Sequence, residues 1–463
     1  MMNTLPATPI SRVALVLAVA SFSLLHATCA PAAQAKQDPP LVMLVSIDGL
    51  KPEAVLEAAA RGLAVPNLRA LVHDGAYATG VRGVLPTLTY PSHMTLMTGA
   101  APDHHGIYAN TTFDPLRIND KGWYWYAEDG HAQTLWSAAA AAHLTSANVY
   151  WPTSVGVSVT WNLPQIWRTG TGDDLKLQRA LATPGLVESL SKELGRYPGG
   201  MEETVAEDEV RARFAVRLLE TRHPDFMTVY FTGLDNEQHA SGPYSPASNA
   251  ALERLDALVG ILRSALARAA PGRATLCVVS DHGFAAVQHD VNLAAAFVAA
   301  GLISVDGAGK VTAWQASPWP AGGTAAIMLA DPANDAVRAE VRLLLGLLAA
   351  DPANGIDRVL DHAEIAAGHG FPDAAFLVAF RPGYELGPAL SGALVAAPAN
   401  LGMHGYLPQY PEMRSSFFIV GPGISPGRAL GEIDMRRIAP TVARALHVTL
   451  RDAELVALDL GAQ

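Results

Sequence analysis

The chain has 463 residues, 50% of them hydrophobic, and a formal net charge of -11 at pH 7. This length and apolar content suffice for a sizeable core, and the acidic balance argues against a nucleic-acid scaffold, which is normally basic. Anionic substrates are not excluded, because a bound metal inverts the local field.

The first 35 residues are typical of a secretory signal peptide. Arg12 precedes an apolar run over residues 13–25 that is too short to span a bilayer comfortably, and Ala33-Gln34-Ala35 fits a cleavage site of small residues. A transmembrane anchor is the alternative. We expect residues 1–35 to be removed, residues 36–40 to form a polar linker, and the protein to be periplasmic or secreted.

The two cysteines also bear on the export and processing of the chain. Cys29 suggests a lipid-anchored protein as an alternative, although His26 and Thr28 fit a lipidation site poorly. After signal cleavage Cys277 is the only cysteine left, so we expect no internal disulfide. Cys277 lies in an apolar run, which favours a buried structural thiol. We expect no membrane span in the processed chain.

The next stretch begins the folded part of the chain. Leu41–Ile47 is an apolar run of strand length that ends at Asp48-Gly49, and Glu53–Arg61 has a helical pattern with Gly62 as its end. Such continuous apolar runs suit a parallel strand that is buried on both faces.

A hydroxyl residue, Thr89, stands directly before a short apolar helical pattern. Pro91 is tolerated in the first turn of a helix, and the apolar residues within Met94–Met97 suit a buried helix that ends at Gly99. A helix N-terminus favours a bound anion such as phosphate. Because a threonine hydroxyl is a weak nucleophile that needs activation, this stretch predicts metal ligands elsewhere.

Six of the eight tryptophans lie between Trp123 and Trp167, in a stretch with weak periodicity. They form either an irregular lid that offers aromatic faces to a substrate base, or a packed cluster, which is the more common role. We therefore expect residues 123–200 to be irregular or capping.

Later in the chain, strand and helix patterns alternate. Amphipathic helical stripes run from Val210 to Leu219 and from Leu252 to Leu266, and strands are predicted at Phe226–Thr232, Ala274–Val279 and Phe417–Val420. Residues 301–397 hold short strands and one helix, and we expect them to cap the same domain, residues 41–463. The alternation predicts an α/β fold with an open, mainly parallel central sheet and helices on both faces.

Acidic or imidazole side chains stand at the ends of three predicted strands: Asp48, Asp235 and the pair Asp281-His282. Each alone is usually a turn residue. In an open parallel sheet, however, ligands bind outside the carboxyl ends of the strands. These side chains are therefore expected to meet at one edge of the sheet.

The candidate metal ligands are mixed carboxylates and imidazoles, which suit zinc or a similar divalent ion. Six are too many for one tetrahedral ion and about right for two ions that share a substrate. They are Asp48, Asp235, His239, Asp281, His282 and His404.

Several short motifs follow one another in a specific order and spacing. They are Ser46-Ile47-Asp48-Gly49, Pro86-Thr87-Leu88-Thr89-Tyr90-Pro91-Ser92-His93, Thr98-Gly99, Pro102 with His105-Gly106-Ile107, Leu234-Asp235 with His239, Asp281-His282-Gly283, and Gly402-Met403-His404-Gly405. With this set the chain, from Leu41 to about Val448, resembles the nucleotide pyrophosphatase/phosphodiesterase family of the alkaline phosphatase superfamily, in its compact bacterial form.

The resemblance implies a role for each matching residue. Thr89 matches the nucleophile that forms a covalent phosphoryl or nucleotidyl intermediate. Asn110 matches a donor to a phosphate oxygen, and Tyr90, in place of the phenylalanine most readily expected, matches an aromatic residue on which a base stacks. The ligands of one ion, which holds and activates the Thr89 oxygen, match Asp48, Asp281 and His282. Those of the second ion, which would activate water, match Asp235, His239 and His404, and both ions are expected to be zinc.

Other histidines are alternatives to these assignments. His369 competes with His404 as the last ligand, and His404 is favoured because it precedes the Phe417 strand as in the family pattern. His93, His104 and His105 are interpreted as structural.

The sequence therefore predicts an exported phosphodiesterase with two divalent ions, expected to be zinc. It would hydrolyse nucleotide phosphodiester or pyrophosphate bonds and release a nucleoside monophosphate. The alternative is a hydrolase of other phosphate esters or phosphonates, such as phosphocholine-type diesters. A sulfatase is disfavoured because the segment after Thr89 lacks the required arginine, and an alkaline phosphatase-type monoesterase usually carries a serine nucleophile. A non-catalytic binding protein is disfavoured because every site position is filled.

Overall fold

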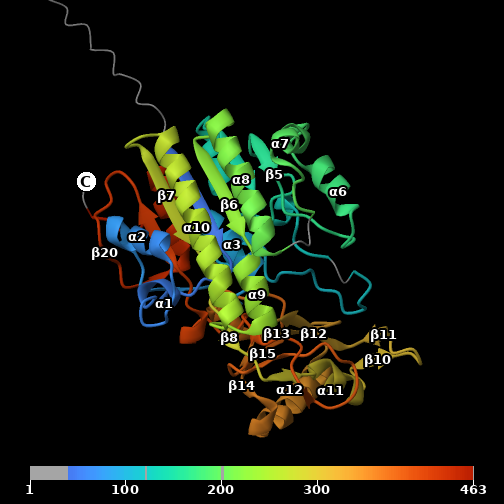
Figure 1. Cartoon of the computed structure of the whole chain (residues 1–463). Coiled ribbons are helices and arrows are strands. Elements are labelled where there is room, and N and C mark those ends of the chain that lie inside the picture. The colour runs from blue at the N-terminus through green and yellow to red at the C-terminus, as the bar shows by residue number, and fades with distance from the viewer. Residues whose placement is uncertain (1–39, 120–121, 200–202, 462–463) are drawn as a thin grey trace, which may run out of the picture. The chain divides into compact units, whose positions relative to one another are not determined.

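An eight-stranded sheet forms the centre of the structure, a computed structural model that describes residues 40–119, 122–199 and 203–461 (Figure 1). The predicted signal peptide, its cleavage site and residues 36–39 of the predicted linker lie outside the described residues. In the described part of the chain, none of the helices combines the length and the apolar character that a bilayer span requires.

The middle of the sheet is parallel. Strand β1 (Leu41–Ile47) lies between β6 (Phe226–Phe231) and β7 (Ala274–Val279) and pairs with both in parallel. All residues of β1 are buried, which explains its continuous apolar sequence. On the far side of β7, β19 (Phe417–Val420) runs antiparallel. The prediction of a mainly parallel sheet is confirmed.

The other strands of this sheet are shorter. The order across the sheet is β20-β2-β19-β7-β1-β6-β4-β5. The remaining members are β2 (Ala76–Tyr77), β4 (Ser146–Val149), β5 (Trp161–Leu163) and β20 (Arg428–Ala429). The sequence suggested that residues 123–200 are irregular or capping. This segment instead contributes β4 and β5, which extend the parallel part of the sheet. This segment also forms η1 (Ala127–Asp129), α5 (Leu135–Ala141), α6 (Asp174–Leu181) and α7 (Leu186–Leu194).

Helices pack against the sheet in two sets. In β6, Thr228 and Tyr230 point to the same face because side chains alternate along a strand. Thr228 accepts a hydrogen bond from Trp136 of α5, and the Tyr230 ring lies 4.6 Å from that of His93 in α3 (Thr89–Thr98), so α3 and α5 cover one face together. A second set contacts α10 (Pro246–Ala269), which lies in front of the sheet in Figure 1, and comprises α2 (Pro66–Asp74), α8 (Val205–Arg222) and α9 (Gly233–Ser241).

One predicted helix is shorter than expected. The pattern over Glu53–Arg61 yields only α1 (Glu53–Leu56), and turns follow up to Gly62. Between Glu57 and Arg61 only Ala58 is buried, so this stretch lacks the apolar face that would hold a longer helix against the core.

A smaller antiparallel sheet lies within residues 301–397, in the order β12-β13-β15-β14. With α11 (Leu293–Ala299) and α12 (Asp335–Ala350) it surrounds a second apolar core (Figure 1). Its strands are β12 (Ala316–Ala321), β13 (Thr324–Leu329), β14 (Ile356–Asp361) and β15 (Phe376–Phe380), and α13 (His362–Ala367) follows β14. We call this part the inserted region.

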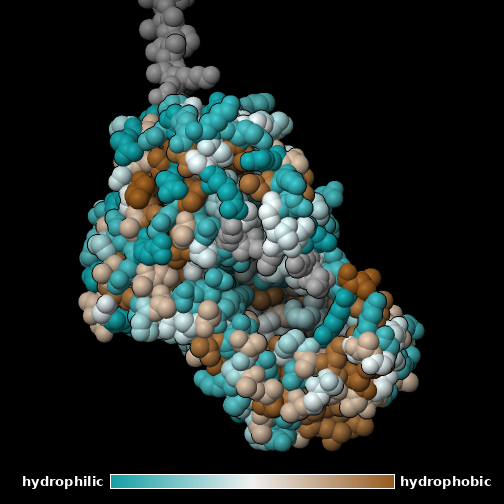
Figure 2. All heavy atoms as spheres, turned by 45° about the vertical axis from the view of Figure 1, so that its right-hand side comes forward, coloured by the Kyte–Doolittle hydropathy of each residue, from teal (hydrophilic) through white to brown (hydrophobic). Residues whose placement is uncertain are grey.

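Short elements complete the fold. β18 (Gly402–Met403) pairs with β8 (Ala285–Ala286), which brings the segment before His404 next to the segment after β7. The others are β3 (Gly80–Arg82) with β21 (Glu432–Asp434), β9 (His289–Val291) between β16 (Tyr384–Leu386) and β17 (Val395–Ala396), β10 (Ile303–Val305) with β11 (Val311–Trp314), α4 (Pro102–His105) and α14 (Ile438–Ala445). In Figure 2 the surface is hollowed between the upper part, which carries the large sheet, and the lower part, which carries the small one.

Cys277 lies on β7 and is fully buried, as the sequence predicts for a structural thiol. Burial also raises the pKa of this thiol far above its usual value, so Cys277 is not a reactive nucleophile.

Candidate active site

Thr89 is the first residue of α3, directly after the extended Leu88. The helix is buried throughout and ends at Gly99, whose φ of 71° suits the left-handed C-cap that glycine favours. The helix predicted from the sequence is therefore confirmed. The Thr89 side chain lies where the amide groups of the first helical turn concentrate partial positive charge.

The imidazole of His282 lies beside the Thr89 hydroxyl, and two carboxylates lie beside the same imidazole nitrogen. Oγ1 of Thr89 lies 3.3 Å from Nε2 of His282. The same nitrogen lies 3.2 Å from Oδ1 of Asp48 and 3.2 Å from Oδ2 of Asp281. Asp48 follows β1 directly, and Asp281 and His282 follow β7, so adjacent parallel strands deliver all three to one edge of the sheet, as predicted.

The hydrogen bonding of this group suits a divalent cation. Nδ1 of His282 lies 3.1 Å from the carbonyl oxygen of Gly283, so the ring donates there and Nε2 carries a lone pair. Oδ1 of Asp48 and Oδ2 of Asp281 are buried and lack a hydrogen-bond partner. Buried carboxylate oxygens that converge with a lone pair are stabilised by a metal ion, so this donor set fits a divalent cation.

The second predicted ligand group, which consists of Asp235, His239 and His404, lies beside the first. Nε2 of His239 is 3.4 Å from Oδ2 of Asp235, and Nε2 of His404 is 3.7 Å from Oδ1 of the same carboxylate. The His404 ring stacks on that of His282 with ring centroids 3.6 Å apart. Asp235 lies in the first turn of α9 rather than in a strand-end loop, which places His239 one turn later on the same helix.

Backbone carbonyls orient both imidazoles of this group. Nδ1 of His239 lies 2.9 Å from the carbonyl oxygen of Gly402, and Nδ1 of His404 lies 3.2 Å from that of Thr87. Each ring therefore directs its Nε2 lone pair toward Asp235, as metal-binding histidines do. Asp235, His404 and His282 bring their ligand atoms within 4.8 Å of one another, and so do Asp48, Asp281 and His282.

Burial determines the protonation of the site in the absence of metal. It raises the pKa of Asp48 well above the usual value, and the nearby charges of Asp235 and Asp281 raise it further. Burial likewise raises the pKa of Asp235, lowers that of His239 to about 4, and lowers that of His404 well below its usual value. The imidazoles are thus neutral, the form that binds a metal, and a cation would offset the repulsion between the carboxylates.

A cavity of about 380 Å³ adjoins the second group. Asn110, His239 and His404 line it, together with two acidic residues, Asp290 and Glu385. Oδ1 of Asn110 accepts a hydrogen bond of 3.0 Å from the backbone N–H of Tyr90, so the amide nitrogen of Asn110 remains as a donor. Asn110 is thus held beside the first turn of α3.

The stacking role expected for Tyr90 needs correction. Its side chain has no exposed area, and its hydroxyl donates to Gln165 at 2.7 Å. The ring packs against Trp123 and Trp125 in an apolar cluster that also contains Trp167. Tyr90 therefore offers no free face to a base, and most of the aromatic stretch packs inside the protein. Trp123 is half-buried in this cluster.

Three other histidines have structural partners. Both ring nitrogens of His93 are used, by the carbonyl oxygen of Thr89 at 2.8 Å and by the Ser46 hydroxyl at 2.9 Å. His105 is buried and bonds to Thr95 and to the backbone of Ile107. His369 does not join the candidate active site. It contacts Asp103 instead, which supports the choice of His404.

The sequence analysis missed several residues that shape the site. Tyr230 donates a hydrogen bond from its hydroxyl to Oδ2 of Asp48. Asp290 and Glu385 come from short strands far apart in the sequence, β9 and β16, which pair in parallel. The position of Tyr230 in a predicted strand indicates which face of the sheet its side chain points to, so its role could have been considered from the sequence. The residues around Asp290 and Glu385 give no local signal that the two lie together.

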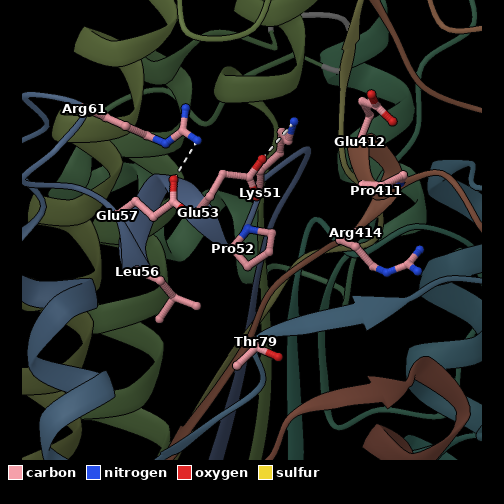
Figure 3. A pocket seen from close by; sticks show the side chains of 10 residues that line it. All are labelled: Lys51, Pro52, Glu53, Leu56, Glu57, Arg61, Thr79, Pro411, Glu412 and Arg414. Carbon is pink, nitrogen blue, oxygen red and sulfur yellow. Dashed lines mark hydrogen bonds and ion pairs between the residues drawn. The ribbon is translucent and has the colours of Figure 1, made fainter.

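A further hollow of about 430 Å³ lies elsewhere (Figure 3). It contains none of the predicted site residues. Its cations have anionic neighbours, since Lys51 pairs with Glu53 at 3.0 Å and Arg61 with Glu57 at 2.8 Å. Its charges are therefore largely balanced.

Comparison with known proteins gives one consistent result. The family model described as type I phosphodiesterase / nucleotide pyrophosphatase matches residues 42–406. Ectonucleotide pyrophosphatase/phosphodiesterase family member 1 of Rattus norvegicus is 27% identical over 263 residues, 55% of this chain and 25% of the rat protein. Family member 7 of Homo sapiens is 27% identical over 282 residues, 59% of this chain and 54% of the human protein. The chain thus spans about a quarter of the rat protein and about half of the human one.

Solved structures share the fold. An inactive threonine-to-alanine variant of murine ectonucleotide pyrophosphatase / phosphodiesterase 5, in complex with AMP, superimposes with a TM-score of 0.64 at 19% sequence identity. The match covers 92% of this chain and 98% of the murine chain. The alkaline phosphatase-like α/β fold expected from the sequence is confirmed.

Proposed function

Because this chain belongs to the type I phosphodiesterase / nucleotide pyrophosphatase family, we propose that it hydrolyses phosphodiester or pyrophosphate bonds of nucleotides and releases a nucleoside monophosphate. The AMP bound to the murine relative supports the nucleotide class. The observation that carries the proposal is the Thr89 hydroxyl at the start of α3, 3.3 Å from Nε2 of His282 and beside two buried carboxylates.

In this proposal the Thr89 oxygen attacks phosphorus, and a covalent bond to Thr89 forms as the leaving oxygen departs. Water then cleaves that bond and regenerates the hydroxyl. Asn110 donates a hydrogen bond to a phosphate oxygen, and the N-terminus of α3 favours the negative charge of the phosphate.

Two divalent cations, proposed to be zinc, would be held by Asp48, Asp281 and His282 and by Asp235, His239 and His404. When bound, they supply positive charge that lowers the pKa of a hydroxyl or water and offsets charge on the phosphate. The orphaned oxygens of Asp48, Asp235 and Asp281 support this assignment.

The test is hydrolysis of three chromogenic substrates by zinc-loaded protein: a nucleotide diester, a phosphate monoester and a phosphocholine ester. We expect a strong preference for the nucleotide diester. A flat profile, or no hydrolysis of the nucleotide diester, would refute the proposed substrate class.

The acidic pair in the cavity favours a second candidate, a diesterase for phosphocholine-type esters. Asp290 and Glu385 are buried beside His239 and His404. Burial, followed by the neighbouring Asp290, raises the pKa of Glu385 to about 8, and the two carboxyl groups form an acidic patch in the cavity wall. One cationic headgroup would match it. Preference for the phosphocholine ester in the same assay would select this function.

We also propose that the protein is exported to the periplasm or secreted. Arg12, the apolar run over residues 13–25 and the small residues at 33–35 support this proposal. N-terminal sequencing of the protein recovered from outside the cytoplasm is the test, and a first residue after Ala35 is the expected result.

A further inference from the structure

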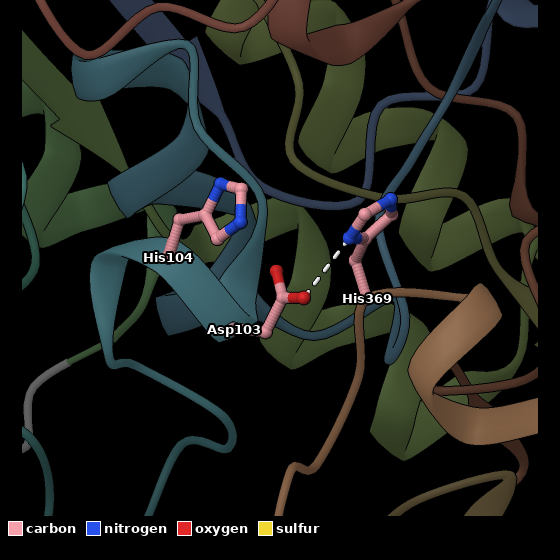
Figure 4. A group of neighbouring side chains, drawn as sticks. All are labelled: Asp103, His104 and His369. Atoms are coloured by element: carbon pink, nitrogen blue, oxygen red, sulfur yellow. Dashed lines mark hydrogen bonds and ion pairs between the residues drawn. The ribbon is translucent and has the colours of Figure 1, made fainter. Parts of the chain in front are cut away.

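Asp103, His104 and His369 form a second group of metal-ligating side chains, apart from the candidate active site (Figure 4). Asp103 and His104 are neighbours on α4, whereas His369 follows α13 in the inserted region. Nδ1 of His369 lies 2.9 Å from Oδ2 of Asp103. One ligand atom from each of the three residues lies within 4.8 Å of the others, the same spacing that is found in the candidate active site.

The chemistry of these donors suits a divalent transition ion. Two imidazoles and one carboxylate are ligands that zinc accepts, with a fourth position left for water. With bonds of about 2.0–2.1 Å, two ligands of a tetrahedral zinc ion lie about 3.3 Å apart. The three ligand atoms already lie within 4.8 Å of one another, so a small shift would bring them to this spacing.

A carboxylate behind His104 fixes the ring for this role. Nδ1 of His104 lies 2.5 Å from Oε1 of Glu454. Glu454 is itself held by the backbone N–H of Ala101 at 2.8 Å and by Arg436 at 2.8 Å. When Nδ1–H donates to Glu454, Nε2 keeps its lone pair, the arrangement in which a carboxylate orients a metal-binding histidine.

Asp103 provides independent support. Its Oδ1 is buried and lacks a hydrogen-bond partner, although Oδ2 is bonded to His369. A buried carboxylate oxygen without a donor is costly, and a cation at this position would satisfy it.

We propose that Asp103, His104 and His369 bind one zinc-like divalent ion that joins the inserted region to the large-sheet part of the protein. His369 lies between Gly368 and Gly370, where an added Cβ would lie 2.8 Å and 3.1 Å from the Leu85 side chain. Leu85 precedes Thr89 by four residues. The ion would therefore hold the loop that packs against the segment leading to the candidate nucleophile, and its role is structural.

The test compares the zinc content of full-length variants after exhaustive dialysis against zinc-free buffer. His369→Asn removes one ligand, and asparagine tolerates the left-handed φ of 56° at this position. His447→Asn is the matched control, because His447 has the same φ of 56° and is exposed at the end of α14. We expect His369→Asn to retain one zinc equivalent less than the parent, and His447→Asn to retain the parent amount.

A second variant distinguishes the loss of a metal ligand from a folding defect. His104→Gln alters an exposed side chain, and His73→Gln, at an exposed position in the last turn of α2, is its control. We expect His104→Gln to weaken the binding of the last zinc equivalent at least tenfold and to lower the melting temperature measured with zinc present. The loss should add to that of Asp281→Asn. Zinc content and melting temperature equal to the parent in both variants would overturn the proposal. So would a parent protein that retains no more than the two zinc equivalents assigned to the candidate active site.

Discussion

The candidate active site and the Asp103 group offer the same kinds of ligand atoms in different surroundings. The side chains of Asp281 and His282 have no exposed area, whereas those of His104 and His369 are 57% and 42% exposed. Backbone carbonyls orient the imidazoles of the active site, while a carboxylate orients His104. Buried carboxylates repel one another strongly when no cation offsets their charge. A metal ion would therefore change the protonation and reactivity of the buried group, whereas at the exposed Asp103 group it would mainly hold two segments together.

We expect the largest effect from Thr89→Ala, which should abolish catalysis and leave metal binding intact. Thr89→Ala removes the hydroxyl and no metal-binding carboxylate or imidazole. We expect diester hydrolysis to fall by about 10⁴-fold or more, because no other hydroxyl replaces the nucleophile. Turnover of a chromogenic diester and zinc content are the measurements. Turnover close to the parent rate would contradict the nucleophile assignment.

Asp281→Asn tests the buried group as a metal site. The amide keeps an oxygen but loses the charge that holds a cation beside His282, so zinc content and rate should fall together, the rate by about 10³-fold. Zinc content is compared with that of Asp290→Asn, a buried acidic residue outside both ligand groups. Unchanged zinc content in Asp281→Asn would remove this residue from the ligand set.

Tyr230→Phe examines whether the orientation of a buried ligand matters. The hydroxyl that donates to Asp48 is lost while the aromatic ring between the sheet and His93 remains. We expect zinc affinity to weaken by about 10- to 100-fold. The readout is activity as a function of free zinc: excess zinc should restore the rate, whereas a rate that no zinc concentration restores would assign Tyr230 a different role.

The smallest effect concerns a buried carboxyl that belongs to neither group. Burial raises the pKa of Glu385 from 4.5 to about 8, so the folded protein binds a proton there that the unfolded chain releases. Stability from this group is fully present below about pH 4.5 and is lost as the pH rises toward 8. Glu385→Gln should flatten this part of the stability profile in urea unfolding at pH 5 and 8. Equal pH dependence in parent and variant would show that Glu385 titrates normally.

The secondary structure near the site was predictable because its signals are local. A parallel strand buried on both faces needs a continuous apolar run, and Leu41–Ile47 and Ala274–Val279 are strands with those bounds. A helix that ends in the left-handed conformation needs glycine, and Gly99 ends α3. Residues that follow parallel strands meet at one edge, so Asp48 and Asp281 came together as expected.

Tertiary structure alone decided what depends on contacts between distant segments. It buried Tyr90 among tryptophans, added β4 and β5 to the large sheet, and brought His369 to Asp103, 266 positions away. Periodicity reports which face of an element is apolar, but not which loop packs against which. The sequence therefore determined the elements and the edge of the sheet where the ligands meet, while long-range packing determined the partner of His369 and which aromatic rings remain accessible.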